Sequence, residues 1–278
     1  MRLRIVLAAL ALLLAATALD AHDLFLRLDS FFVRPESTAR IRVLNGTFSS
    51  SENAVARNRL SDISVVGPPG RIKLDTTLWQ ATGDTSRLSV PIGATGTYVV
   101  GASTLPREIT LEAKEFNAYL EEDGIPDVLA ARRRAGELET KATERYSKHV
   151  KAILQAGTRR SGDFNRVLGY PAELVPLNNP YLSRAGGWLR VAALVDGKPV
   201  ANQLVVAGGR PPRGGRLAER RVRTDTDGIA RIRITDGGQW YVKFINMVRV
   251  AGGSTPRPAG TPAFDYESKW ATLTFEIK

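Results

Sequence analysis

Two histidines, His22 and His149, are the only imidazoles in this sequence of 278 residues, and cysteine is absent. Any metal site in this chain must therefore use histidine, carboxylate, amide oxygen, methionine or a terminal amine. A histidine at a free N-terminus offers both its α-amine and its imidazole to one metal, and these donors suit nickel and copper. His22 is thus a candidate metal ligand if processing leaves it first. Otherwise it is an ordinary residue at the start of a strand.

The beginning of the chain has the pattern of an export signal. Two arginines precede an unbroken apolar run over residues 5–16, which is shorter than the about 20 residues that a membrane-spanning helix needs. The small residues that follow allow two cleavage positions, one leaving Leu19 first and the other leaving His22 first. We therefore expect residues 1–21 to be a signal peptide and the mature protein to be periplasmic, without an integral membrane segment.

His149 is the candidate second ligand. Apolar residues in the stretch 137–155 recur with helical spacing, and His149 lies at the edge of the stripe that they would form. A packed or capping histidine is the alternative at such a position. Two imidazoles and a terminal amine would give a metal three nitrogens, but the spacing does not determine whether they meet. Met247 is a possible soft ligand and fits a core position better.

Composition and motifs favour binding over catalysis. The formal net charge is +11, but the basic stretches lack the interleaved aromatic residues that stack on bases, so we interpret them as solvated faces and expect no nucleic-acid partner. The sequence contains neither a Gly-x-Ser-x-Gly nucleophile motif nor a phosphate-binding Gly-x-x-x-x-Gly-Lys loop. The acidic stretch 121–123 is typical of a solvated helix end. We expect the protein not to be an enzyme.

The elements that would position these residues are mostly β-strands. Short runs with alternating apolar residues, such as residues 38–43 and 270–277, are separated by turn residues, which is typical of antiparallel sandwiches. Helices are predicted near residues 116–120, at 126–134 and at 137–155. The predicted organisation is a signal peptide, a β-sandwich, a helical insert, a linker and a second β-sandwich, at residues 1–21, 22–112, 113–157, 158–184 and 185–278.

Several stretches together resemble one bacterial family of exported, uncharacterised proteins. They are AHDLFL (residues 21–26), KEFNAYLEEDG (114–124), ERYSK (144–148), ELVPL (173–177), NPY (179–181), DGKP (196–199) and WATLTFE (270–276). In order and spacing they cover nearly the whole mature chain. Members of this family are often described as a periplasmic component of cobalt or nickel uptake, and that description rests largely on association.

The resemblance implies two sandwiches around a helical insert, the second one transthyretin-like or carboxypeptidase-regulatory-like. It also implies a histidine just after the signal cleavage site, which matches His22, and a His-Met pair where this chain has Asn246 and Met247. The first hypothesis is a periplasmic protein that binds nickel or cobalt through His22 and His149 and assists a membrane uptake transporter. A scaffold without metal is the alternative, and a copper oxidase using the terminal chelate is the weaker one.

Overall fold

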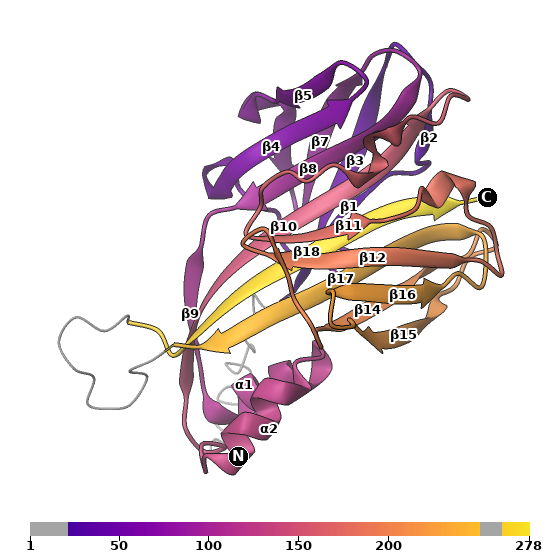
Figure 1. Ribbon diagram of the computed structural model, residues 1–278. Coiled ribbons are helices and arrows are strands. Elements are labelled where there is room, and N and C mark those ends of the chain that lie inside the picture. Colours follow the sequence, from indigo (N-terminus) through magenta and orange to yellow (C-terminus); the bar gives the residue numbers. More distant parts are fainter. Residues whose placement is uncertain (1–21, 251–262) are drawn as a thin grey trace, which may run out of the picture.

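The computed structural model describes residues 22–250 and 263–278, which form three β-sheets and two helices (Figure 1). The predicted signal peptide and its cleavage position therefore lie outside the described residues. The predicted mainly β, sandwich-like fold is confirmed. The alternation predicted for residues 38–43 is seen in one strand, where Ala39, Ile41 and Val43 are buried between more exposed neighbours.

The first sheet has four antiparallel strands. In sheet order these are β1 (Asp23–Arg27), β3 (Ser37–Gly46), β7 (Thr85–Ile92) and β6 (Trp79–Thr82). The third sheet also has four strands, which are β11 (Ala172–Pro176), β12 (Trp188–Val195), β13 (Lys198–Pro199) and β16 (Ile229–Arg233). Short 3-10 helices connect some of the strands, at Arg57–Arg59, Thr76–Leu78, Gly162–Asn165 and Pro180–Leu182.

The second, central sheet has ten strands and lies between the other two. Its main path is β15 (Leu217–Arg223), β14 (Leu204–Arg210), β17 (Gly238–Arg249), β18 (Tyr266–Ile277), β10 (Ala142–Ala156), β8 (Gly96–Thr104), β4 (Leu60–Gly67) and β5 (Gly70–Lys73). Two further strands pair with β10, namely β2 (Phe32–Val33) and β9 (Arg107–Leu111). The sheet therefore combines strands from both halves of the chain, joined by the parallel pair β10 and β18.

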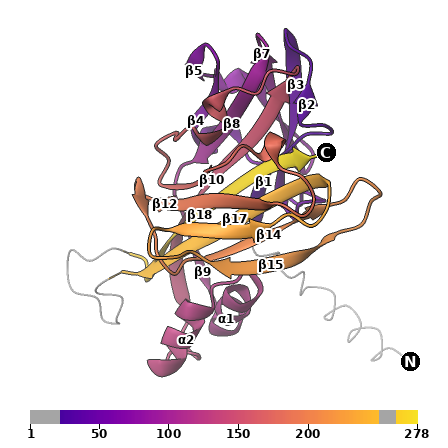
Figure 2. The same cartoon turned by 45° about the vertical axis from the view of Figure 1, so that its right-hand side comes forward.

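Alternating residues of β10 show that the outer sheets cover opposite faces of the central sheet. Val150, Ala152 and Leu154 belong to the core formed with the first sheet, whereas Ile153 belongs to the core formed with the third sheet. Successive side chains of a strand point to opposite faces, so the two cores lie on either side of β10. Figure 2 shows β12 of the third sheet beside β17 and β18 of the central sheet.

The predicted helix over residues 137–155 is wrong, because β10 occupies Ala142–Ala156. A strand that is covered on both faces has no polar face, so it lacks the simple alternation from which a strand is predicted. The helical insert is therefore shorter than predicted and consists of α1 (Ala113–Glu122) and α2 (Pro126–Arg134). Residues 172–176, assigned to a linker from the sequence, form β11. The predicted domain boundaries stay a prediction.

The two helices lie at one end of the central sheet (Figure 1). Phe116 and Leu120 of α1 are fully buried and join Ile245 of β17 and Trp270 of β18 in a separate apolar cluster. This cluster holds α1 beside the start of the first strand, and it is the reason why residues distant in sequence line a common cavity there.

Candidate functional site

His22 lies immediately before β1, and its side chain is 25% exposed. Its Nε2 atom lies 2.8 Å from Oε2 of Glu52, so the imidazole is in close polar contact with this carboxylate. The backbone is held more firmly, because the ammonium of Lys148 donates a hydrogen bond to the carbonyl oxygen of His22 and another to Oδ1 of Asn45, at 3.0 Å. His22 is thus positioned through its main chain, and its imidazole faces the carboxylate of Glu52.

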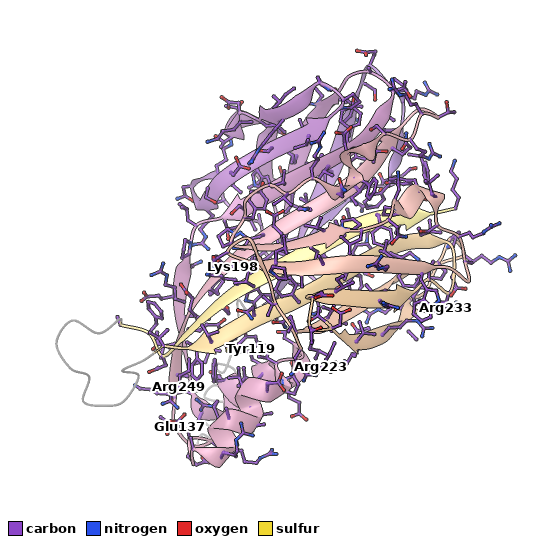
Figure 3. All side chains as sticks on the ribbon, viewed as in Figure 1. Tyr119, Glu137, Lys198, Arg223, Arg233 and Arg249 are labelled. Atoms are coloured by element: carbon purple, nitrogen blue, oxygen red, sulfur yellow. The ribbon has the colours of Figure 1, made fainter. Side chains whose placement is uncertain are left out.

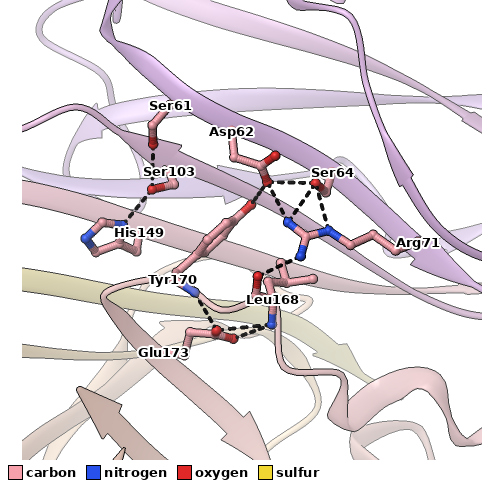
Figure 4. A network of polar contacts seen from close by, with 9 residues as sticks. All are labelled: Ser61, Asp62, Ser64, Arg71, Ser103, His149, Leu168, Tyr170 and Glu173. Atoms are coloured by element: carbon pink, nitrogen blue, oxygen red, sulfur yellow. Dashed lines mark hydrogen bonds and ion pairs between the residues drawn. The ribbon is translucent and has the colours of Figure 1, made fainter. Parts of the chain in front are cut away.

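His149 is buried in β10 and is 2% exposed. Both ring nitrogens are occupied, with Nδ1 at 2.9 Å from the hydroxyl of Ser103 and Nε2 at 2.9 Å from the hydroxyl of Ser147. Burial lowers the pKa of His149 to about 3, so the ring is neutral near pH 7. Figure 4 shows the ring beside Ser103 and near Tyr170, within a network of polar side chains. It is therefore a satisfied core histidine.

The structure does not bring the two histidines together. Lys148 and His149 are neighbours on one strand, so their side chains point to opposite faces of the central sheet. The side chain of Lys148 reaches His22 on the face that the first sheet covers, and His149 packs against Tyr170 on the other face. The predicted two-imidazole metal site of His22 and His149 is not formed, because the central sheet separates its members.

Asn246 and Met247 also lie away from His22. Met247 is 8% exposed and belongs to the apolar cluster under the helices. This position agrees with its interpretation as a core residue. The Asn246 side chain donates to Oε1 of Gln203 at 3.0 Å, beside a separate cavity next to the α1–α2 connection. A histidine at position 246 would therefore face that second cavity.

One cavity has a volume of about 500 Å³, and His22 is part of its wall. It lies where the start of β1, helix α1, strand β17 and the β14–β15 connection meet. Figure 3 labels Tyr119 of α1 close to this region. The cavity is lined by His22, Asp23, Phe25, Gly46, Thr47, Phe48, Ser49, Glu115, Ala118, Tyr119, Glu122, Asp123, Gly209, Arg210, Arg216, Leu217, Glu219 and Tyr241.

Three aromatic rings form one wall of the cavity. The ring centroids of Phe25 and Phe48 are 5.4 Å apart, and both lie close to the ring of Tyr241, at 5.2 and 5.1 Å. The Tyr241 hydroxyl donates to Oε1 of Glu219 at 2.8 Å. Because the three rings pack against one another, Phe25 and Phe48 edge-on and Tyr241 tilted, and because the Tyr241 hydroxyl is hydrogen-bonded, this wall is held rigid.

A buried group of charges lies beside the cavity, which two of its members, Asp23 and Asp123, line. The Lys243 ammonium forms an ion pair with Oδ2 of Asp23 and lies 3.6 Å from Oδ1 of Asp123. Burial, together with the negative charge of Asp23, raises the pKa of Asp123 to about 7. Although burial opposes a charged ammonium, the two carboxylates hold the pKa of Lys243 above its ordinary value.

One carboxylate oxygen in this group has no hydrogen-bond partner within the described part of the chain. Asp23 is 9% exposed, and this oxygen is its Oδ1 atom. A buried carboxylate oxygen is costly unless a partner satisfies it, and water or a ligand in the cavity could do so. His22 and Asp23 are adjacent in the chain and line the same cavity. The imidazole of the one and the carboxylate of the other are each potential metal donors.

These donors alone do not complete a metal site. Within residues 22–250 and 263–278, no three side chains of histidine, cysteine, aspartate or glutamate gather closely enough to hold a metal ion. A metal contacting His22 and Asp23 would need further ligands from the terminal amine, from water or from a bound molecule. Of the two predicted metal ligands, His22 therefore remains a candidate in this cavity, and His149 does not.

Several residues of the site were not predicted from the sequence. Asp123 was assigned to a solvated helix end, but its side chain is only 20% exposed and faces Lys243. The feature of the sequence that could have indicated this ion pair is Lys243, a single lysine within the apolar stretch 240–245 of β17. A lysine in such a run needs a carboxylate partner, although the sequence does not say which one.

Similarities to solved structures are low. The chain is similar to a segment of two fibronectin type III domains from chicken tenascin, with 12% identity, 91% of this chain and 97% of that chain covered, and a TM-score of 0.20. A DUF4785 family protein from Legionella pneumophila matches at 11% identity, 79% and 52% coverage and a TM-score of 0.24. A mutant alpha-2-macroglobulin from Salmonella matches at 12% identity, 90% and 15% coverage and a TM-score of 0.23. The chain thus spans only part of these last two proteins.

No curated protein matches the chain. Of the helices in the described part of the chain, none has the length and apolar character to span a membrane. One family does match, over residues 19–247, which includes the candidate site from His22 to Lys243. The chain therefore belongs to the family described as a domain of unknown function, DUF4198.

Proposed function

We propose that this protein is a non-catalytic, periplasmic binding protein that captures nickel or cobalt and passes the metal to a membrane uptake transporter. The observation that carries the proposal is that one cavity is bordered by His22, whose Nε2 lies 2.8 Å from Oε2 of Glu52, and by Asp23, whose buried Oδ1 has no hydrogen-bond partner among the described residues. Imidazole nitrogen together with carboxylate oxygen suits a divalent transition metal.

The charge of the cavity also supports cation capture. The whole chain carries a formal charge of +11. The cavity wall is different, because the acidic side chains in it outnumber the two arginines; the acidic residues are Asp23, Glu115, Glu122, Asp123 and Glu219. An acidic cavity on a basic protein concentrates cations locally, while the rest of the surface repels them.

The N-terminal amine would strengthen the site. If signal cleavage leaves His22 first, its α-amine joins its imidazole in a chelate, and Asp23 supplies an oxygen from the next residue. The hydrogen bond from Lys148 to the carbonyl of His22 fixes the main chain of this residue beforehand. A ligand that is already positioned loses less conformational entropy when the metal binds.

Metal binding by variants of the mature protein tests this proposal. Protein that begins at His22 is expected to retain one nickel or cobalt ion in native mass spectrometry, and His22→Gln is expected to weaken binding in calorimetry by at least about tenfold. His149→Gln is the matched control, because it removes the other imidazole from the opposite face of the sheet and is expected to leave the affinity unchanged. Equal affinities of all three proteins, or no binding by any of them, would contradict the proposal.

The same experiment addresses the other two hypotheses. A copper oxidase required a second imidazole beside His22, and the buried, doubly hydrogen-bonded His149 does not support that role. Absence of metal binding by a folded protein that starts at His22 would leave a scaffold as the better description. Tight binding without oxygen consumption in the presence of copper is the result expected of a carrier.

A further inference from the structure

The cavity beside His22 is much larger than a metal ion requires. A bare ion is held directly by its ligands, whereas about 500 Å³ lies within the range of about 300–1,000 Å³ typical of sites for small organic molecules. The protein donors are also too few, since no cluster of three histidine, cysteine or carboxylate side chains suitable for a metal occurs among the described residues. Besides the terminal amine, water or a bound small molecule can therefore supply the remaining ligands of a captured metal.

We infer that the cargo is a metal ion already held by a small zwitterionic chelator of the amino-acid type, which fills the cavity and completes the coordination of the metal. This inference rests on the proposed function and specifies its substrate. His22 and Asp23 would contact the metal, and the rest of the cavity would recognise the chelator. The lining of the cavity supplies one feature for each part of such a molecule.

The aromatic wall would take the apolar part of the chelator. Phe25, Phe48 and Tyr241 are packed together within 5.1–5.4 Å and form a rigid surface on which a flat ring or an alkyl chain can lie. A hydrated metal ion would gain nothing from contact with three aromatic rings, because it would lose water without gaining ligands. This wall therefore favours an organic component in the cargo.

The charged residues of the wall fit a molecule that carries both signs. Arg210 ends β14 and Arg216 precedes β15, and guanidinium groups pair well with carboxylates. Glu115 and Glu122 of α1 line the same cavity and can pair with an ammonium group. A polycarboxylate such as citrate would meet the arginines but would be repelled by the glutamates, so the combination favours an amino-acid chelator.

Native mass spectrometry and calorimetry of the mature protein can test this inference with nickel alone, nickel with L-histidine, nickel with citrate, and L-histidine alone. The expected result is a ternary mass of protein, nickel and histidine, with an affinity at least about tenfold tighter than that for nickel alone or with citrate. Phe48→Ala should weaken the ternary complex by about tenfold and leave binding of nickel alone unchanged. Phe32→Ala, which removes an aromatic ring outside the cavity, is the matched control and should change neither.

The outcomes separate this inference from the proposed function. If histidine strips nickel from the protein, or if nickel binds equally well with and without it, the inference is wrong and metal capture by His22 still stands. A preference for nickel citrate would also overturn the inference. Failure to bind nickel under every condition would overturn both. If Phe48→Ala weakens the binding of nickel alone and of nickel with histidine equally, the aromatic wall does not recognise the chelator and that part of the inference is wrong.

Discussion

Replacing Lys151 with alanine is expected to lower the free energy of unfolding by about 3–5 kcal/mol. Lys151 and Glu173 form an ion pair with an N–O distance of 3.0 Å, and their side chains are only 2% and 1% exposed. The variant would leave the Glu173 carboxylate buried without its counter-charge, and burial of an unpaired charge is among the most destabilising changes in a protein.

This ion pair also ties the chain after β10 to the central sheet. The Glu173 carboxylate accepts hydrogen bonds from the backbone N–H groups of Leu168, at 2.9 and 3.1 Å, and of Tyr170, at 2.8 Å (Figure 4). The Lys151 ammonium also donates to the carbonyl oxygen of Arg166 at 3.0 Å. The double variant Lys151→Met with Glu173→Leu should therefore recover only part of the loss, because these backbone groups would stay unpaired in the core.

Urea denaturation followed by circular dichroism measures these differences. The matched control is Asp127→Asn, which removes a carboxylate from the ion pair with Arg223 at 2.8 Å, where the Asp127 side chain is 69% exposed. That change should cost less than about 1 kcal/mol, because solvent screens an exposed pair. A loss for Lys151→Ala as small as that of the control would show that the buried pair does not contribute as argued.

Much of the fold could be predicted from local patterns. The strand over residues 38–43 was predicted because apolar and polar residues alternate there, and β3 buries Ala39, Ile41 and Val43 while Thr38 and Arg40 are exposed. Helix α2 was predicted at its observed bounds, Pro126–Arg134, because a proline favours the first helical turn. These elements have one covered face and one exposed face, so their periodicity survives in the sequence.

The central strand β10 could not be predicted in the same way. It is covered on both faces, and its polar residues are buried with partners contributed by other strands: Lys148 by His22 and Asn45, His149 by Ser103, and Lys151 by Glu173. Local spacing carries no information on those partners. The apolar residues that remain happen to fit a helical stripe, and tertiary packing overrides that local preference.

The candidate site was predicted only at the residue with distinctive chemistry. His22 was identified because a terminal chelate is a local property. The charges of Asp123 and Lys243 meet Asp23 from α1 and β17, and the aromatic wall joins Phe25 to Tyr241 across the whole chain. Contacts between residues so far apart in sequence depend on the order of strands, which a single sequence does not reveal.

The buried His149 predicts a second large effect, on the dependence of stability on pH. Burial lowers the pKa of His149 to about 3 in the folded protein, with a smaller contribution from Lys269, whereas the ordinary value is 6.5. Between these values the unfolded chain binds a proton that the folded protein does not, so the free energy of unfolding falls as the pH falls below 6.5. The expected loss through this residue is about 2 kcal/mol between pH 8 and pH 5.

Other groups titrate in the same range, so a variant is needed to isolate His149. Asp123, with a pKa raised to about 7, acts in the opposite direction, because its folded form holds a proton more readily and loses stability as the pH rises toward 7. His149→Gln stays neutral at every pH and keeps groups that can bond Ser103 and Ser147. The stability of the wild-type protein relative to this variant should therefore fall by about 2 kcal/mol from pH 8 to pH 5. A constant difference would mean that the folded protein protonates His149 as easily as the unfolded chain does, which its two serine contacts and its burial argue against.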